Sequence, residues 1–589
     1  MYADNKYYVL KTLSTLLPYV RRYRGGLALG IGALLMKDLL AVSQPLIIKN
    51  GVDSLTHGFQ VKIVVELAAL LIGISLVKGL FQYWMRVIII GISRDIEFDL
   101  RNDLFRHFVE LSQDFYARFR TGDIMARSTN DLNAVRMMLG PGIMYWSETS
   151  VMLVLAVAVM IQADWRLTLM ALIPAPLVSV AVIFFGRKIH TRFEHIQRMF
   201  SDISSKVQEN LAGVRVIRAY AQEKAEVEQF EALNREYVRE NIGLARIQGA
   251  FMPLLQALIG VTFLLVLWAG GQQLLMGKIS LGSFVMFNTY MGMLIWPMIA
   301  FGWVVNLMQR GTASLNRINE MLDERPRIAR PADGRIADPA EFAAEIDFRD
   351  VTMSFGGRDA VSNVDLTIHS GETVAIVGHT GSGKTTLVSL IPRLFDPTSG
   401  AVELDGLDLR RFDPEDLRRQ IGFVPQETFL FSATLAENIA WGAPDATRDQ
   451  IEWAAEVAGL ASDIEGFPNG LETVIGERGL TLSGGQKQRA AIARAILRNP
   501  RILILDDALS SVDTVTEEKI LSGLAGVMRD RTTILISHRV STVQNADRII
   551  VLSHGSIVET GTHDELQRRG GYYAELYQKQ LLEEELQAI

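Results

Sequence analysis

Six long apolar stretches constrain the fold of this chain more than any other feature. They occupy residues 27–48, 62–84, 138–161, 167–186, 250–271 and 281–308 of the 589 residues. A helix needs about 20 mostly apolar residues to cross the hydrocarbon core of a bilayer, and each stretch comes close to that length. Because lipid offers the backbone no hydrogen-bond partners, stretches of this kind must be helical. The sequence therefore predicts six membrane-spanning helices in its N-terminal half.

The segments between these stretches differ in length and in charge. The short connections after the first, third and fifth stretches have few basic residues (Lys49, Arg166 and Lys278). The two long connections have many: Arg94, Arg101, Arg106, Arg118, Arg120 and Arg127, then Lys188, Arg192, Arg198, Lys206, Arg215 and Arg218. Basic loops stay on the cytoplasmic side. We expect both termini and both long segments in the cytoplasm, the long segments as continuations of the membrane helices, and the loop near Gly58 outside.

The composition changes after about residue 347 to the charged, glycine-punctuated texture of a soluble α/β protein. We expect a six-span membrane domain at 1–323, a linker at 324–345 and a soluble domain at 346–589. The formal net charge of −7, without a polybasic segment, argues against a nucleic-acid partner. The absence of cysteine excludes disulfides, thiol catalysis and thiolate metal sites. No cleavable signal is evident.

Several charged residues lie at or near the apolar stretches: Lys37, Asp38, Glu66, Lys78 and Glu148. An unpaired charge in the bilayer is costly, so these side chains should face a partner or a wet cavity. Pairing between helices and contact with a substrate are both open, and pairing is the simpler interpretation.

A glycine-rich turn follows a short apolar strand in the soluble half, in ETVAIVGHTGSGKTTLVSL. The turn matches the phosphate-binding P-loop pattern, in which backbone N–H groups and a helix N-terminus surround phosphate oxygens. Lys384 is expected to reach the β and γ phosphates of ATP, and the Thr385 hydroxyl to ligate Mg²⁺. The expected nucleotide-binding residues of this turn are Gly378, His379, Thr380, Gly381, Ser382, Gly383, Lys384, Thr385 and Thr386.

Two further features extend this site. The strand RILILDD delivers Asp506, an acidic partner for Mg²⁺ beside a P-loop. The run LSGGQKQR opens a helix with Ser483, Gly484 and Gly485, which is a second arrangement suited to an anion. One chain thus contains two half-sites for phosphate.

The ordered motifs GHTGSGKT, VPQ, LSGGQ, LILDD, SSVD and SHR resemble the nucleotide-binding domain of ABC transporters, and the six preceding spans resemble an exporter half-transporter. The resemblance covers nearly the whole chain. It implies that two nucleotide-binding domains meet head to tail, so that each ATP lies between the P-loop of one subunit and the signature motif of the other. A second half-transporter would then be an obligatory partner.

The resemblance also implies roles for individual residues. Phe355 takes the place of the adenine-stacking tyrosine, Gln426 contacts Mg²⁺ and the attacking water, and His538 contacts the γ-phosphate. Ser483, Gly484, Gly485 and Gln486 form the signature motif that contacts the partner's ATP, and Asp513 lies in the loop between the two sites. The expected metal ligands are Thr385, Gln426 and Asp506. The segments FYARFRTGDIMARSTND and AGVRVIRAYAQE resemble the short coupling-helix regions.

Asp507 departs from the family pattern, in which this position is the glutamate that acts as general base. Aspartate withdraws the carboxylate by one methylene, and a misplacement of about 1 Å can cost about 10²-fold in rate. With an intact signature motif, this looks like one member of a heterodimeric exporter whose partner has the catalytic glutamate. The alternative is a homodimer in which Asp507 is a slow but working base.

We therefore expect an ATP-driven exporter subunit in the plasma (inner) membrane, with ATP and Mg²⁺ as cofactors. Membrane lipids and a small amphipathic substrate (a drug, lipid or peptide) are its other expected partners. Two other classes stay open: a channel or signalling protein gated by ATP, and an importer. Importers of this superfamily usually keep the two domains on separate chains, whereas here they are fused.

Overall fold

The computed structural model describes residues 12–57, 60–328, 330–331, 342–476 and 482–587. The chain divides into two compact units, Met1–Val109 with Phe119–Glu324, and Glu110–Arg118 with Arg325–Ile589. Parts of the predicted linker (residues 329 and 332–341), the ends of the chain (1–11 and 588–589) and the position of Gly58 lie outside the described residues.

Six helical runs in the described part of the first unit are long and apolar enough to cross a membrane, which confirms the predicted number. They are Arg24–Thr56, Val61–Glu110, Thr121–Ala163, Trp165–Ala212, Glu223–Leu275 and Leu281–Leu322. The helices α4 (Val61–Glu110), α10 (Ala175–Ala212) and α12 (Glu223–Leu275) extend far beyond the apolar stretches. The long basic segments therefore do continue the membrane helices, and α12, at 53 residues, is about 80 Å long.

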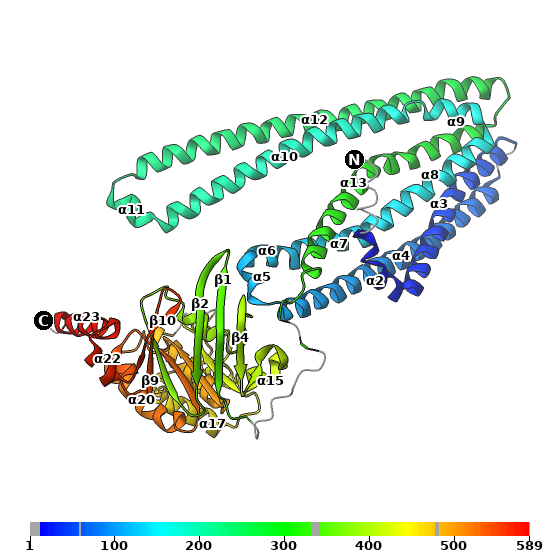
Figure 1. Ribbon diagram of the computed structural model, residues 1–589. Helices are drawn as coiled ribbons and strands as arrows, with labels where there is room; N and C mark the ends of the chain where they lie inside the picture. Colours follow the sequence, from blue (N-terminus) through cyan, green and yellow to red (C-terminus); the bar gives the residue numbers. More distant parts are fainter. Residues whose placement is uncertain (1–11, 58–59, 329, 332–341, 477–481, 588–589) are drawn as a thin grey trace. The chain divides into compact units, whose positions relative to one another are not determined.

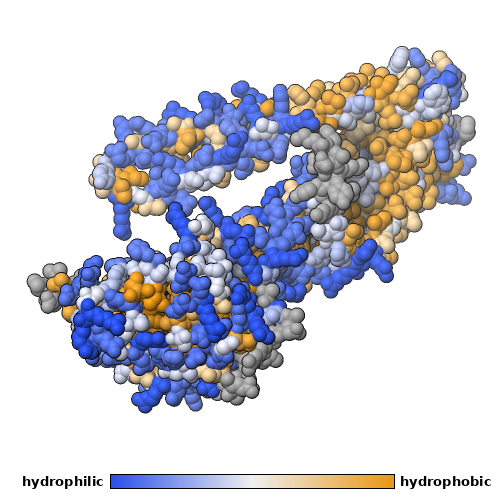
Figure 2. Space-filling model, in the orientation of Figure 1, coloured by the Kyte–Doolittle hydropathy of each residue, from blue (hydrophilic) through white to orange (hydrophobic). Residues whose placement is uncertain are grey.

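Apolar and polar residues cover different parts of these helices. α10 and α12 run side by side as a long hairpin, joined through the short helix α11 (Val214–Ala219) (Figure 1). Apolar residues cover the part of the unit around α3 (Arg24–His57), α4 and α8 (Ile143–Ala163), while polar residues dominate the hairpin toward α11 (Figure 2). Both segments that resemble coupling regions form short helices. AGVRVIRAYAQE contains α11, and FYARFRTGDIMARSTND overlaps α5 (Gln113–Arg118) and contains α6 (Thr121–Ala126).

The last membrane helix, α13 (Leu281–Leu322), is the centre of packing in this unit. Its buried residues Phe287, Tyr290 and Leu294 form one apolar cluster with residues of α8, α9 (Trp165–Leu172) and α12. The Tyr290 hydroxyl donates to the Val42 carbonyl of α3 at 2.5 Å, so the polar end of this buried ring is satisfied.

Two irregularities arise near prolines. A π-helical turn, η2 (Met138–Gly142), contains Pro141, and α9 ends just before Pro174. Proline has no N–H for the helical ladder, so a helix at this residue must widen, bend or restart. The third and fourth apolar stretches are consequently interrupted helices.

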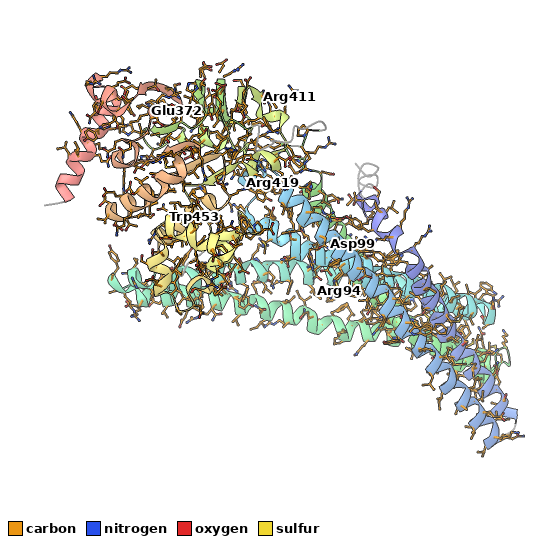
Figure 3. The ribbon with its side chains drawn as sticks, turned by 90° about the horizontal axis from the view of Figure 1, so that it is seen from below. Arg94, Asp99, Glu372, Arg411, Arg419 and Trp453 are labelled. Carbon is orange, nitrogen blue, oxygen red and sulfur yellow. The ribbon has the colours of Figure 1, made fainter. Side chains whose placement is uncertain are left out.

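The N-terminal helix α2 (Leu17–Arg22) is fixed to α4 by hydrogen bonds. Asp99 of α4, labelled in Figure 3, accepts from Arg22 at 3.1 Å and from Tyr23 at 3.0 Å. One turn further on, Tyr19 donates to Asp103 at 2.7 Å. These polar contacts belong to the part of α4 beyond its apolar stretch.

A buried carboxylate joins α13 to the π-helical turn η1 (Arg127–Asp131). Asp131 is 7 % exposed and accepts hydrogen bonds from Ser314 at 2.9 Å and from Arg317 Nε at 2.8 Å. Arg127 donates to the Arg317 carbonyl at 2.7 Å, which ties the same two elements together a second time.

The second unit is built on two sheets (Figure 1). The six-stranded sheet has the order β10-β9-β3-β8-β7-β6, with all strands parallel except β10. Its strands are β3 (Thr373–Val377), β6 (Ile421–Val424), β7 (Ile502–Asp506), β8 (Thr532–Ile536), β9 (Arg548–Ser553) and β10 (Ser556–Gly561). The antiparallel sheet has the order β2-β1-β4-β5, from β1 (Ile346–Phe355), β2 (Arg358–Ile368), β4 (Ser399–Leu404) and β5 (Leu407–Asp408).

Helices complete this unit. They are α14 (Lys384–Ser389), α15 (Pro414–Arg419), α16 (Leu435–Ala440), α17 (Arg448–Val457), α18 (Ala461–Gly466), α19 (Gly484–Leu497), α20 (Thr514–Met528), α21 (Val540–Val543), α22 (His563–Arg569) and α23 (Tyr572–Gln587). Strand β7 is buried on both faces: Ile502 and Ile504 join the cluster between the two sheets, and Leu503 and Leu505 join the cluster beneath α16, α17, α19 and α20. A continuous apolar run is typical of such a parallel strand.

We predict that Asp131→Ala lowers the thermal unfolding midpoint of the purified protein. It removes hydrogen bonds to a charged group, which contribute about 1.5–3 kcal/mol, while the partly exposed Arg317 can regain water. Glu231→Ala is the control, because Glu231 pairs with Arg235 at an exposed position and such pairs contribute about 1 kcal/mol or less. Equal midpoints for the two variants would contradict the prediction.

Candidate nucleotide site

The carboxyl ends of four neighbouring parallel strands form the candidate site. β3 leads into Gly378, β8 leads to His538, β7 ends at Asp506 and β6 is followed by Gln426. Asp506 lies opposite Ile536, and Ile536 lies opposite Ile376, so the strand ends are level. A pocket of about 190 Å³ opens there, lined by Ala360, Thr380, Gly381, Gly383, Lys384, Thr385, Thr386, Gln426, Asp506, Asp507, Ile536 and His538. The structure thus places most of the predicted P-loop and catalytic residues around one cavity, where ligands of parallel α/β sheets bind.

The P-loop backbone has a conformation that only glycine allows at two points. Gly378 and Gly383 have φ of 151° and 99°, and a Cβ would lie 2.1 Å from the Leu552 carbonyl oxygen and 2.2 Å from that of Ala360, respectively. Gly383 is the N-cap of α14, whose N-terminus therefore faces the pocket. Glycine at these two positions lets the loop pack closely against the neighbouring backbone, in the conformation in which its N–H groups can surround phosphate.

Lys384 is held inside this loop. Its side chain is buried, and Nζ donates to the carbonyl oxygens of Gly378 at 2.7 Å and His379 at 2.9 Å. Burial lowers the pKa of Lys384, and the nearby Asp506 and Asp507 carboxylates oppose that effect. The ammonium group is therefore held at the loop by its backbone.

Asp506 has the properties of a metal ligand. It is 1 % exposed, and neither carboxylate oxygen has a hydrogen bond of normal geometry among the described residues. Burial raises the pKa of Asp506, the Thr385 hydroxyl lowers it, and the Asp507 carboxylate raises it further. Mg²⁺ usually binds through one or two carboxylates together with substrate phosphates. Asp506, Thr385 and Gln426 line the same pocket and could hold it in that way.

Asp507 lies in a left-handed backbone conformation, with φ of 51°. Its N–H donates to the Ile536 carbonyl at 2.9 Å, so the backbone is fixed to β8. Asparagine and aspartate tolerate this conformation better than longer side chains. The sequence motif gave no sign of this backbone geometry, which offers a local reason for a short side chain.

The ring of His538 is held neutral near pH 7. Burial lowers the pKa of His538, Lys384 lowers it further, and Asp507 opposes both. A neutral imidazole can donate one hydrogen bond to a phosphate oxygen without adding charge.

The signature residues do not line this pocket. Ser483 is the N-cap of α19: its Oγ accepts from the Gln486 N–H at 3.3 Å, and Gln486 Oε1 accepts from the Ser483 N–H at 2.9 Å. Gln486 also donates to Asp463 at 2.8 Å. Gly484 and Gly485 begin the helix behind this cap. Among the described residues, the Ser483 hydroxyl donates no hydrogen bond.

Four other predicted residues do not line this pocket. Phe355 ends β1 and packs edge-on against Phe395, with ring centroids 5.3 Å apart, leaving it 42 % exposed. The His379 ring packs edge-on against Tyr572 at the start of α23. Ser382 is buried, and Asp513 caps α20 by accepting from the Thr516 N–H at 3.0 Å.

Two residues that the sequence did not single out fix the loops of the site. Gln488 of α19 donates to the Ser510 hydroxyl and accepts from the Ser511 N–H, both at 2.9 Å. Arg539 donates to the Val512 carbonyl at 2.8 Å and is paired with Glu517. The loop after β7 is therefore joined both to the signature helix and to the residue after His538. Gln488 lies in the run LSGGQKQR and Arg539 is the last residue of SHR, but the sequence motifs assigned a role to neither of them.

A P-loop with an acidic strand end beside it, and a second anion-binding helix start on the same domain, define a nucleotide hydrolase domain, here fused to six membrane helices. The family described as "ABC transporter transmembrane region" matches residues 27–298 and the family described as "ABC transporter" matches residues 361–510. This chain belongs to the ABC transporter family, and its soluble unit is the ATP-binding ATPase domain of that family.

Relatives match over nearly the full length. The chain is 37 % identical over 564 residues to "Probable multidrug resistance ABC transporter ATP-binding/permease protein YheI" of Bacillus subtilis, covering 94 % of this chain and 95 % of that protein. It is 38 % identical over 571 residues to "Multidrug resistance-like ATP-binding protein MdlA" of Escherichia coli, covering 96 % and 95 %. An "ATP-dependent lipid A-core flippase" of Syntrophus aciditrophicus is 34 % identical over 571 residues, covering 97 % and 95 %.

A solved structure has the same fold. It is described as a bacterial Atm1-family ABC exporter with ATP bound, superposes with a TM-score of 0.79 at 26 % identity, and covers 95 % of this chain and 99 % of that one. The predicted fold class, a six-helix membrane domain fused to an α/β P-loop domain, is confirmed.

Lys384→Ala should weaken ATP binding at this P-loop by about 10- to 100-fold, because hydrogen bonds to charged groups contribute about 1.5–3 kcal/mol. Labelling by a photoreactive ATP analogue measures the loss. Lys519→Ala, an exposed position on α20, removes the same charge as a control. Unchanged labelling of Lys384→Ala would contradict the assignment.

Proposed function

We propose that this chain is one half of an ATP-driven exporter that moves amphipathic molecules such as drugs, lipids or peptides out across the plasma (inner) membrane. The observation that carries the proposal is the fusion of a complete P-loop pocket to six membrane helices in one chain. Relatives named for multidrug resistance and for lipid A-core flipping support the amphipathic substrate class. In the proposed division of labour, 1–323 transports, 324–345 links and 346–589 binds ATP.

The geometry of the signature motif supports a dimer. Ser483 and the two glycines after it form an anion-binding helix start, but none of them lines the pocket around Lys384. A phosphate bound at the P-loop therefore requires a signature motif from a second subunit. Two such composite sites would close when ATP binds and open after hydrolysis, because the ligand favours the closed state.

Within the composite site, each residue has a proposed part. Lys384 exchanges its carbonyl partners for phosphate oxygens, and neutral His538 donates to the γ-phosphate. Asp506, Thr385 and Gln426 would hold Mg²⁺, which when bound offsets charge on the phosphate oxygens. The Asp507 carboxylate takes the proton of the attacking water, and its short side chain makes it a poor base there.

We further propose that the partner is a different half-transporter, with glutamate at the position equivalent to Asp507. Asp507 supports this proposal, because a short base on this chain's P-loop is harmless if the other composite site carries the turnover. A homodimer in which Asp507 is the working base is the alternative.

The heterodimer predicts effects of very different size for two substitutions, measured as the steady-state ATPase of the assembled transporter. Asp507→Asn should change turnover little. Ser483→Ala should lower it by about 10²–10³, because it removes a hydrogen bond to the partner's γ-phosphate in the transition state. Ser483→Thr, which keeps both the cap and the donor, is the matched control.

The same measurement on this chain expressed alone separates the two assemblies. Full substrate-stimulated ATPase of the single chain, abolished by Asp507→Asn, would reject the heterodimer. ATP turnover that no transported substrate alters would favour a channel or signalling role over export.

The proposed orientation places the soluble unit and both termini in the cytoplasm. The chain has no cysteine, so single Cys substitutions can be labelled without background. We expect an impermeant thiol reagent added outside intact cells to label Lys278→Cys, in a short connection, but not Arg218→Cys, near the tip of the α10–α12 hairpin. Both positions are exposed. The reverse pattern would overturn the orientation.

A further inference from the structure

Three charged residues meet in the middle of the membrane helices. Lys37 Nζ lies 2.8 Å from Asp38 Oδ1 on α3 and 2.6 Å from Glu148 Oε1 on α8. Lys37 and Asp38 are at the centre of the apolar stretch 27–48, and Glu148 is close to the centre of 138–161. Lys37 and Glu148 therefore form an ion pair between two helices. Such pairing is one of the two interpretations that the sequence left open for these charges.

The pairing leaves one negative charge over. Two carboxylates face one ammonium group, and the helices that carry them are apolar at this depth. An uncompensated charge near the bilayer centre is costly, and intramembrane ionisable groups are functional sites by default. The cluster therefore needs one further positive charge.

One residue of the cluster shows where that charge would be accepted. Asp38 is 1 % exposed, and its Oδ2 is enclosed without a hydrogen-bond partner among the described residues. A buried polar atom in that state calls for a ligand. Since Asp38 is almost wholly enclosed, the ligand must be small, and a proton needs no cavity at all. The side chain of Glu148, by contrast, is 25 % exposed.

We propose that the cluster of Lys37, Asp38 and Glu148 is a proton-binding site, with the proton held on Asp38 and exchanged through Glu148. A proton that binds the exposed Glu148 carboxylate passes to Lys37 as the ammonium group gives one of its own to Asp38 Oδ1, the oxygen that it faces. The neutral carboxyl group then leaves no charge on the enclosed Oδ2. The O–H bond of Glu148 breaks, an O–H bond forms at Asp38, and Lys37 ends with the charge it began with. The cluster becomes neutral, so α3 and α8 can stay packed.

Within the part of the chain that the structure describes, no other charged group shares this role. The charged groups that act on Asp38 from the described residues are Lys37 and Glu148. The titratable group that α13 presents to α3, Tyr290, donates to the Val42 carbonyl, and Lys78 of α4 donates to Gln44 at 3.0 Å. A change of protonation at the cluster is therefore a change at Asp38 or Glu148.

Infrared spectroscopy of the full chain in lipid nanodiscs tests the proposal. At about pH 8, exposed carboxyl groups with ordinary pKa values near 4 are ionised. A neutral carboxylic acid still shows its C=O stretching band. We expect the wild-type spectrum minus that of Asp38→Asn to contain this band. Asp506, whose pKa is also raised by burial, contributes equally to both spectra and cancels.

Two further variants make the result specific. Glu66→Gln removes an acidic group from α4, where Glu66 is exposed beside Lys62, and should keep the band. Glu148→Gln leaves Lys37 and Asp38 as a neutral pair, so Asp38 should lose its proton and the band should vanish although Asp38 is intact. The Glu148→Gln spectrum still tests the proposal if Asp38→Asn does not fold.

A band unchanged in both Asp38→Asn and Glu148→Gln, or lost equally in Glu66→Gln, would overturn the proposal. The measurement uses neither ATP nor a transported substrate. The proton site can therefore fail while the export function stands, and the reverse is equally distinguishable.

Discussion

The parallel hydrogen-bond ladder that joins β3, β8 and β7 is the constraint on which the soluble unit depends. It holds the P-loop, His538 and the Asp506–Asp507 pair at one level, although the P-loop precedes the other two by more than 100 residues in the chain. Because β7 is buried on both faces, its apolar side chains pack into a core on either side of the sheet. The cores between the sheets and beneath the helices thus fix the position of chemically active groups that they do not touch.

The membrane unit follows a different constraint. Its backbone must be satisfied within each helix, which leaves side chains to decide how the helices associate. α13 meets this requirement with a buried stripe of apolar residues and a tyrosine bonded to α3. Polar pairs such as Arg22–Asp99 and Arg317–Asp131 lie beyond the apolar stretches, and the cluster of Lys37, Asp38 and Glu148 is an exception that lies within them. That exception gives the cluster its interest, since three ionisable groups in an apolar core require an explanation beyond packing.

Much of this architecture could be predicted from the sequence because its signals are local. Apolar runs of the right length give six spans, and the strand, glycine turn and helix around Lys384 give the P-loop. Other features depend on tertiary contacts that no local pattern contains. The φ of Asp507 is set by its hydrogen bond to β8, and Gln488 matters because its helix happens to face the loop after β7. The pairing of Lys37 with Glu148, 111 residues away, is of the same kind.

The position of the Lys384 ammonium group has a consequence for which nucleotides the domain accepts. Its ammonium group is bonded to two carbonyl oxygens of its own loop, so a ligand must replace those contacts with oxygens of its own. A monophosphate has no β or γ oxygens to offer and leaves the lysine where it is. ADP and ATP can compete for it, and ATP has the larger negative charge with which to do so. The loop therefore discriminates by the length of the phosphate chain, independently of any contact with the base.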